Sequence, residues 1–312
     1  MDLIADIGAT NARCALLDRQ GRIAHSAVYH NADFAALEDV LRHFVTSQSG
    51  KSPKRAALAI AAPVSGDEVV MTNIGWHFSQ AALCEALGLE ELRVINDFAA
   101  LAQALPRLKS GDCHRIGGGR AIAGSTLAVI GPGSGLGVAT AAAQGDGWTA
   151  VGGEGGHVSL PAMTETEMAL IAEHGDPNGH CSAETLLSGP GLVRIHATLA
   201  RLARHEGIVM TPATITSAAL AGDELATRTY AVFFALLGTV AGNLALTVGA
   251  RGGVFIGGGI VPRVIEAFER SDFRERFVAK GRYRAYLNAI PTAVITADLP
   301  AFIGLKALLG YC

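Results

Sequence analysis

The chain has 312 residues, of which half are apolar and 17% are charged, so it can bury one large hydrophobic core or two ordinary ones. A formal net charge of −3 and the absence of a Lys/Arg run exclude the electrostatic footprint of a nucleic-acid-binding protein. The five cysteines are odd in number, widely spaced and without a CxxC pair, which is typical of reduced thiols in a cytoplasm. The first residues lack a basic segment followed by a long apolar one, so we expect no signal peptide.

The first third of the chain predicts short strands separated by turns, with helices between them. Ser79 is placed to cap one of these helices, and Gly88 to end it. The polar segment that begins at Arg107 interrupts the pattern and suggests a domain boundary. The predicted strands cover residues 3–7, 12–18, 23–28, 55–62 and 69–72, and the predicted helices cover residues 32–44 and 80–87.

The remaining chain continues the alternation of strands and helices. Such alternation throughout indicates the α/β class. Strands are predicted at residues 127–130, from Val138 onward, at 253–256 and at 293–296. Helices are predicted at 164–173, 183–187, 191–205, 223–248 and 301–309.

Asn96 and Asp97 lie where an apolar strand meets the first turn of a helix. At such a junction, an Asn or Asp can cap the helix or direct its side chain into a cleft. A carboxylate fixed between apolar segments is a plausible general base. The two interpretations of Asp97, helix cap and catalytic base, remain open at this point.

Two glycine turns, each between an apolar strand and a return strand, offer backbone N–H groups suited to a polyphosphate. In the first, Gly8 permits close approach, Thr10 offers a hydroxyl, and Asp6 offers a carboxylate for hydrated Mg²⁺. The second carries glycines at 131, 133, 135 and 137. Neither turn matches a Walker or Rossmann motif. An ordinary hairpin is the alternative for the first turn, and a flexible glycine loop is the alternative for the second.

Other polar and glycine-rich segments suit a sugar and a nucleoside. Glu154 and His157 lie three apart among glycines, and Glu184 follows a Ser182 cap; carboxylates and an imidazole can bind hydroxyls of a polyol. Helix capping is the alternative for Glu184. Gly257, Gly258 and Gly259 follow a strand, where a flat base can lie against backbone.

Two further patterns could indicate a zinc site and a membrane span, and we expect neither. His174, His180 and Cys181 lack a fourth ligand at a usual spacing, so we expect a solvated loop. Residues 231–250 carry no charge and include a small-xxx-small pattern. Since no second apolar span is present to pair with it, the sequence favours a buried helix in a large domain.

Nine motifs follow one another along the chain. They are Asp6 to Arg13, Ala62 to Asp67, Thr72-Asn73-x-x-Trp76, Asn96 to Phe98, Gly133 to Gly137, Gly152 to His157, Glu184 to Gly191, Gly242 to Leu246 and Gly257 to Arg263. Together they resemble the motifs of the bacterial glucokinase family, in the same order from residue 2 to about residue 306. Ala9 stands where many relatives have glycine, Ser134 where many have threonine, and Cys181 precedes the Ser-Ala-Glu motif. The zinc-binding cysteine cluster of the ROK family of sugar kinases and repressors is missing, which places the chain outside that branch.

The resemblance implies an actin-like ATPase fold with two α/β domains flanking a cleft. Residues 1–108 and 299–312 would form the small domain and residues 109–298 the large one. It also implies a cytoplasmic homodimer that transfers the γ-phosphoryl group of ATP to the 6-hydroxyl of glucose with Mg²⁺. Asp97 would be the base, with Asn96, Glu154, His157 and Glu184 on the sugar. The nucleotide and metal would meet Asp6, Ile7, Gly8, Ala9, Thr10, Asn11, Gly133, Ser134, Gly135, Gly257, Gly258 and Gly259, with Asp6 reaching Mg²⁺ through water.

Two alternatives remain. A kinase for mannose or glucosamine would share every motif, because selectivity at the sugar 2-position cannot be inferred from them. A sugar-sensing regulator on the same fold would need a DNA-binding module before the first strand. Since that strand begins at residue 2 or 3, we expect no such module.

Overall fold

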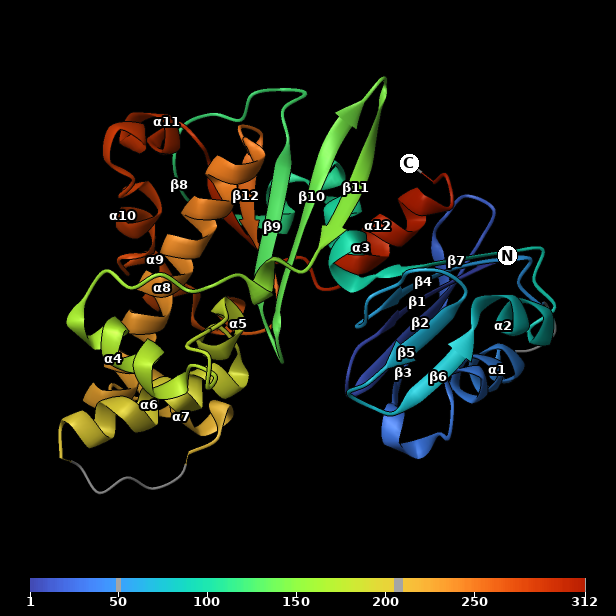
Figure 1. Cartoon of the computed structure of the whole chain (residues 1–312). Coiled ribbons are helices and arrows are strands. Elements are labelled where there is room, and N and C mark those ends of the chain that lie inside the picture. Colours follow the sequence, from blue (N-terminus) through green and yellow to red (C-terminus); the bar gives the residue numbers. More distant parts are fainter. Residues whose placement is uncertain (49–51, 205–209, 312) are drawn as a thin grey trace. The chain divides into compact units, whose positions relative to one another are not determined.

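Strands and helices alternate along the chain of the computed structural model, so the predicted α/β class is confirmed (Figure 1). The structure describes residues 1–48, 52–204 and 210–311. The chain folds into two compact units. The first contains Met1–Leu108, Gly147–Gly152 and Ala297–Cys312, and the second contains Lys109–Asp146 and Gly153–Thr296.

The first unit is built on a five-stranded sheet with the order β3-β2-β1-β4-β7. Strands β1, β2 and β3 form an antiparallel meander, whereas β4 and β7 run parallel to β1. Strands β1 and β4 are almost fully buried, which explains their unbroken apolar sequences. The strands are β1 (Asp2–Ile7), β2 (Asn11–Leu17), β3 (Ile23–His30), β4 (Arg55–Ile60) and β7 (Glu91–Asn96), and a separate hairpin contains β5 (Glu68–Met71) and β6 (Trp76–Ser79).

Helices α1 (Leu37–Ser47), α2 (Gln80–Ala86), α3 (Asp97–Ala104) and α12 (Pro300–Leu308) complete the first unit. Side chains of β1 form one hydrophobic cluster with α1 and α2. The C-terminal helix α12 packs against α3 and also meets β1 and β4. The last helix of the chain therefore belongs to the same unit as the first strand.

The second unit contains a six-stranded sheet with the order β11-β10-β9-β12-β13-β8. Strands β9 and β10 form an antiparallel hairpin, and β12 runs parallel to both β9 and β13. Ligands bind at the carboxyl ends of parallel strands in open α/β sheets, which here are the ends of β9 and β12. The strands are β8 (Cys113–Gly117), β9 (Leu127–Pro132), β10 (Leu136–Gln144), β11 (Gly147–Gly153), β12 (Gly253–Ile256) and β13 (Thr292–Ile295).

Helix α8 (Glu224–Val248) is the central helix of the second unit. By length and composition it could cross a membrane, but 61% of its most apolar window is buried within the protein. Gly238 and Gly242 allow the backbone of α10 to approach it closely. The other helices are α4 (Glu165–His174), α5 (Ala183–Leu186), α6 (Gly189–Leu202), α7 (Pro212–Leu220), α9 (Ile265–Glu269), α10 (Phe273–Val278) and α11 (Arg284–Asn288).

Most predicted elements are present with shifted ends, and some predictions were wrong. The helix predicted from residue 32 begins at Leu37, because residues 31–33 form a 3-10 turn. Residues 148–153, predicted as part of a glycine-rich loop, form β11. The predicted end of α6 at residue 205 lies outside the described residues. Strands β6 and β8 and helix α7 were not predicted.

Candidate active site

The turn between β1 and β2 is closed by backbone hydrogen bonds. The Gly8 N–H donates to the Asn11 carbonyl at 3.0 Å, and the Asn31 N–H donates to the Thr10 carbonyl at 2.9 Å. The buried Asn31 side chain also donates to the Gly8 carbonyl at 2.8 Å. Sequence reasoning missed Asn31, which fixes the turn from β3 and leaves the exposed Thr10 side chain at its tip. Ile7 is buried at the end of β1, and Ala9 continues the turn.

Asp6 is partly buried on β1, and its carboxylate lies 3.4 Å from the Arg13 guanidinium on the paired strand β2. Burial raises the pKa of Asp6, while Arg13 lowers it. A single carboxylate beside a glycine turn fits Mg²⁺, which proteins usually bind through one or two carboxylates, waters and substrate phosphates. Within the described residues there is no group of three or more His, Cys, Asp or Glu side chains that could hold a metal by itself.

Asn96, not Asp97, is the cap of helix α3. Its side-chain oxygen accepts from the N–H groups of Phe98 and Ala99 at 2.9 and 3.2 Å. Its amide donates to the Ala62 carbonyl at 3.3 Å. The Asp97 carboxylate accepts the Phe98 N–H at 2.9 Å but does not cap the later N–H groups of the turn. This division of roles leaves the Asp97 carboxylate available for chemistry.

Burial is the main cause that raises the pKa of Asp97 to about 6. The Phe98 N–H opposes this effect, and the negative charge of Asp6 adds to it. The register explains why the two acids influence each other: Asp6 pairs with Ala59 on β4, and Ala59 pairs with Ile95 on β7. Both carboxylates therefore lie at the carboxyl edge of the first sheet, and Asp97 remains partly exposed.

In the second unit, the turn between β9 and β10 contains Gly133, the exposed Ser134, and Gly135. The Gly133 N–H donates to the Gly135 carbonyl at 2.8 Å, and the Gly189 N–H donates to the Gly133 carbonyl at the same distance. Gly189 begins α6, whose cap is Ser188. Sequence reasoning did not predict that this helix start supports the turn.

Glu184 contacts this turn directly. Its carboxylate accepts the Leu136 N–H at 2.8 Å, and a side chain at position 135 would collide with it. Helix α5, which carries Glu184, is capped by Ser182 as predicted. The glycine at 135 therefore leaves room for the Glu184 carboxylate in its present position. One carboxylate oxygen of Glu184 already serves the fold of the turn.

Glu154 and His157 flank a 3-10 turn, η4 (Gly155–His157), with both side chains largely exposed. Their nearest charged atoms are 4.0 Å apart. A Cβ at Gly156 would collide with the Leu136 carbonyl, so the glycines are required by close packing on β10. Glu184 and the turn that carries Glu154 and His157 therefore both contact Leu136, the first residue of β10.

Gly257, Gly258 and Gly259 follow β12 and lie beside the β9–β10 turn. The Gly257 N–H donates to the Ile130 carbonyl at 2.9 Å. A Cβ at Gly131 would lie 2.6 Å from the Gly257 carbonyl carbon, and Gly258 has a φ of +76°. A Cβ at Gly259 would meet no atom within 4 Å. The second glycine turn and the segment from Gly257 to Gly259, both predicted to meet a nucleotide, are therefore neighbours within this unit.

The predicted site residues are therefore divided between the two units. The first holds Asp6, Thr10, Asn96 and Asp97 at one sheet edge, and the second holds the other acids, His157 and the two glycine segments. Whether both sets bind one pair of ligands stays a prediction. The two histidines that were considered as zinc ligands each have a hydroxyl partner. His174 lies 2.9 Å from the Thr198 hydroxyl, and His180 lies 3.1 Å from the Ser159 hydroxyl.

Comparison with known proteins places the chain in a family. The glucokinase family model matches residues 3–310. The chain is 44% identical to a glucokinase of Paramagnetospirillum magneticum, covering 99% of this chain and 97% of that protein. It is 45% identical to a glucokinase of Psychromonas ingrahamii, with the same coverage.

Among solved structures, glucokinase from an Antarctic psychrotroph superposes with a TM-score of 0.87 at 37% identity, covering 100% of this chain and 99% of that one. Glucokinase from Balamuthia mandrillaris, solved with glucose, superposes with a TM-score of 0.79 at 20% identity, covering 98% of this chain and 92% of that one, and shows the fold alone. The sequence motifs, the fold and the full-length matches agree: the chain belongs to the glucokinase family.

Proposed function

We propose that this protein is an ATP-dependent glucokinase that transfers the γ-phosphoryl group of ATP to the 6-hydroxyl of glucose. The proposal rests on one observation above the others. A carboxylate with a raised pKa lies at the start of α3, free of the capping role that Asn96 fulfils. The full-length similarity to proteins named glucokinase supports the choice of sugar.

In the proposed mechanism, Asn96, Glu154, His157 and Glu184 bind hydroxyls of the sugar and orient it. Asp97 accepts the proton of the attacking 6-hydroxyl at a carboxylate oxygen. Its pKa of about 6 keeps it ionised near neutral pH while making it a stronger base than an ordinary aspartate. Phosphoryl transfer depends mainly on positioning and charge stabilisation, so the rigid placement of this carboxylate matters more than covalent chemistry.

The nucleotide's phosphates are assigned to the backbone N–H groups and small side chains of the two hairpin turns. These residues are Ile7, Gly8, Ala9, Thr10 and Asn11 in one turn and Gly133, Ser134 and Gly135 in the other. The nucleoside is assigned to Gly257, Gly258 and Gly259. Asp6 would hold Mg²⁺ through water, and the ion would offset negative charge on the phosphates.

The remaining proposals concern the protein as a whole. Residues 1–108 with 299–312 and residues 109–298 would act as the small and large domains. The enzyme would work as a cytoplasmic homodimer at the entry to glycolysis. Light scattering coupled to gel filtration tests the dimer, for which a mass near 64 kDa is expected from a 32.2 kDa chain.

A coupled assay that detects ADP tests the function directly. The purified protein is supplied with MgATP and, in separate reactions, with glucose, mannose, fructose or glucosamine. We expect kcat/KM to be highest for glucose. A higher value for mannose or glucosamine would reassign the protein to another hexose, and no turnover with any sugar would reject the kinase.

A further inference from the structure

Helix α3 carries Asp97 at its first position, and α12 lies against it (Figure 1). Gly304 on α12 faces the backbone of α3 directly. A Cβ on Gly304 would collide with the Ala100 carbonyl and lie 3.2 Å from the Ala104 nitrogen. Ala100 is one helical turn after Asp97. The gap between the two helices is therefore set by a glycine opposite the turn that begins with Asp97.

The far end of α12 is fixed to the strands that precede α3. The Arg55 guanidinium donates to the Leu309 carbonyl at 3.2 Å, and the Arg93 guanidinium donates to the Leu308 carbonyl at 2.8 Å. Cationic donors at a helix C-terminus satisfy its free carbonyls and its dipole. Arg55 lies on β4 and Arg93 on β7, and β7 leads directly into Asp97.

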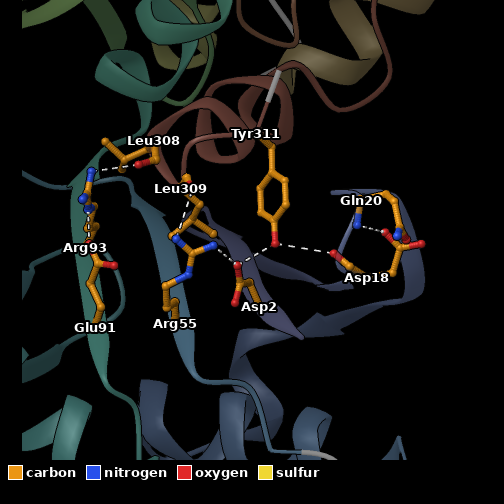
Figure 2. A network of polar contacts seen from close by, with 9 residues as sticks. All are labelled: Asp2, Asp18, Gln20, Arg55, Glu91, Arg93, Leu308, Leu309 and Tyr311. Carbon is orange, nitrogen blue, oxygen red and sulfur yellow. Dashed lines mark hydrogen bonds and ion pairs between the residues drawn. The ribbon is translucent and has the colours of Figure 1, made fainter.

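A third anchor follows the helix. The Tyr311 hydroxyl donates to the Asp2 carboxylate at 2.7 Å, and the same carboxylate oxygen accepts from Arg55 (Figure 2). Asp2 is buried, so its carboxylate would be costly to the fold without these hydrogen-bond partners. Asp2, Arg55, Arg93 and Tyr311 together form what we call the tail clamp. Figure 2 shows the clamp joining the first strand to the last residues of the described chain.

We propose that α12, held by the tail clamp and seated through Gly304, positions α3 so that the Asp97 carboxylate is correctly placed for catalysis. The proposal rests on the proposed role of Asp97 as the base. Asn96 fixes the first turn of α3 from the end of β7, and α12 fixes the helix by packing against it. Gly304 and the clamp are positioning residues, since none of them is assigned a contact with substrate.

Gly304→Ala is the first test variant. The added methyl group must push α3 away from α12, and a displacement of about 1 Å at a catalytic group can lower turnover about 100-fold. We expect kcat to fall at least tenfold while KM for ATP stays within twofold, because ATP is assigned to other residues. Gly238→Ala is the matched control: it adds a methyl group against the Phe273 carbonyl in a buried helix of the other unit. It should lower stability without changing kcat at a temperature well below unfolding.

A double-mutant cycle with Asp97→Asn separates positioning from general damage. If Gly304 acts through Asp97, adding Gly304→Ala to Asp97→Asn should lower kcat by less than twofold further. A full additional tenfold loss would overturn the proposal. Tyr311→Phe combined with Arg55→Met weakens the clamp without crowding and should reduce kcat at least threefold, again only when Asp97 is present.

Two outcomes distinguish the proposals from each other. Normal kcat in Gly304→Ala beside a strongly impaired Asp97→Asn overturns the positioning role and leaves the proposed function intact. Normal kcat in Asp97→Asn itself removes the catalytic base and the positioning role with it. Circular dichroism and thermal unfolding of each variant confirm that the assays compare folded proteins.

Discussion

At the scale of single residues, Asn96 and Asp97 show how neighbouring polar groups divide two tasks. An amide side chain caps α3 as well as a carboxylate would, and it carries no charge to be desolvated. The carboxylate next to it is held in a partly buried position near Asp6, where its charge is unfavourable. The site therefore keeps a more basic group at a cost in stability.

The pH dependence of turnover follows from the raised pKa of Asp97. The proposed base works only when ionised, so kcat/KM for glucose should be nearly constant above about pH 7 and approach a tenfold fall per unit below about pH 5. Initial rates at saturating MgATP from about pH 4 to about pH 8 measure this limb. A limb that lies below pH 4.5 would show that Asp97 has an ordinary pKa and that burial does not tune it.

Replacing Asp97 with Asn should stabilise the protein at neutral pH while it impairs turnover. The pKa of Asp97 is higher in the folded than in the unfolded chain, so its ionisation destabilises the fold fully above about pH 6 and not below the ordinary aspartate value. After allowance for partial exposure, we expect Asp97→Asn to gain about 1 kcal/mol at pH 8 and nothing at pH 3.5. Urea denaturation at the two pH values measures the difference, and an equal gain at both would contradict this cause.

At the scale of elements, a buried ion pair joins α4 to α10 in the second unit. Arg276 donates to Glu167 at 2.6 and 3.1 Å, with the two side chains only 12% and 3% exposed. Glu167 also accepts the Met163 N–H at 2.6 Å. The bidentate pair between Arg284 and Glu275 has similar distances but lies on the surface.

These two pairs should respond differently to the loss of the arginine. Arg276→Ala leaves a buried carboxylate unpaired and should cost about 3–5 kcal/mol of unfolding free energy. Arg284→Ala removes an exposed pair and should cost less than about 1 kcal/mol. Urea denaturation of both variants gives the comparison. Equal losses would show that burial of the Arg276 pair does not decide its contribution.

The elements that sequence reasoning found and missed differ in their local signals. Ser79 and Ser182 each cap a helix as predicted, because capping depends on neighbours two or three residues away. Strands β8 and β11 lack a continuous apolar pattern, and only their pairing in the sheet shows that they form. Helix α7 has local signals that were overlooked, namely the Thr211 cap and Pro212 at its first position.

The same distinction holds for the site. Asp97 and the glycine turns could be found from strand ends and local composition. The bond from Leu136 to Glu184 and the support of the first turn by Asn31 join residues 48 and 23 positions apart, respectively. No local pattern encodes such contacts. The glycines at 155 and 156, predicted to mark a ligand loop, are required by packing on β10.

At the scale of the whole molecule, the chain begins and ends in the same unit. Strand β1 and helix α12 both belong to it, while most of the intervening 109–296 forms the other. The tail clamp joins these ends through Asp2 and Tyr311. Unfolding of the first unit therefore depends on residues from both termini, and its stability cannot be assigned to the N-terminal sequence alone.

The proposed sugar ligands belong to both units, since Asn96 and Asp97 lie in the first and Glu154, His157 and Glu184 in the second. A multi-domain protein can unfold in more than one step, and a ligand stabilises only the parts that bind it. Glucose at 100 times its Kd should add about 2.7 kcal/mol, or roughly 5 °C or more in Tm. Differential scanning calorimetry should show every unfolding transition moving upward with glucose and none with equimolar sorbitol.

Glu184→Ala should lose most of this shift in Tm, whereas Asp97→Asn should retain much of it, because an amide still binds a hydroxyl. A shift confined to one transition would mean that glucose binds one unit alone and that the assignment of its ligands is wrong.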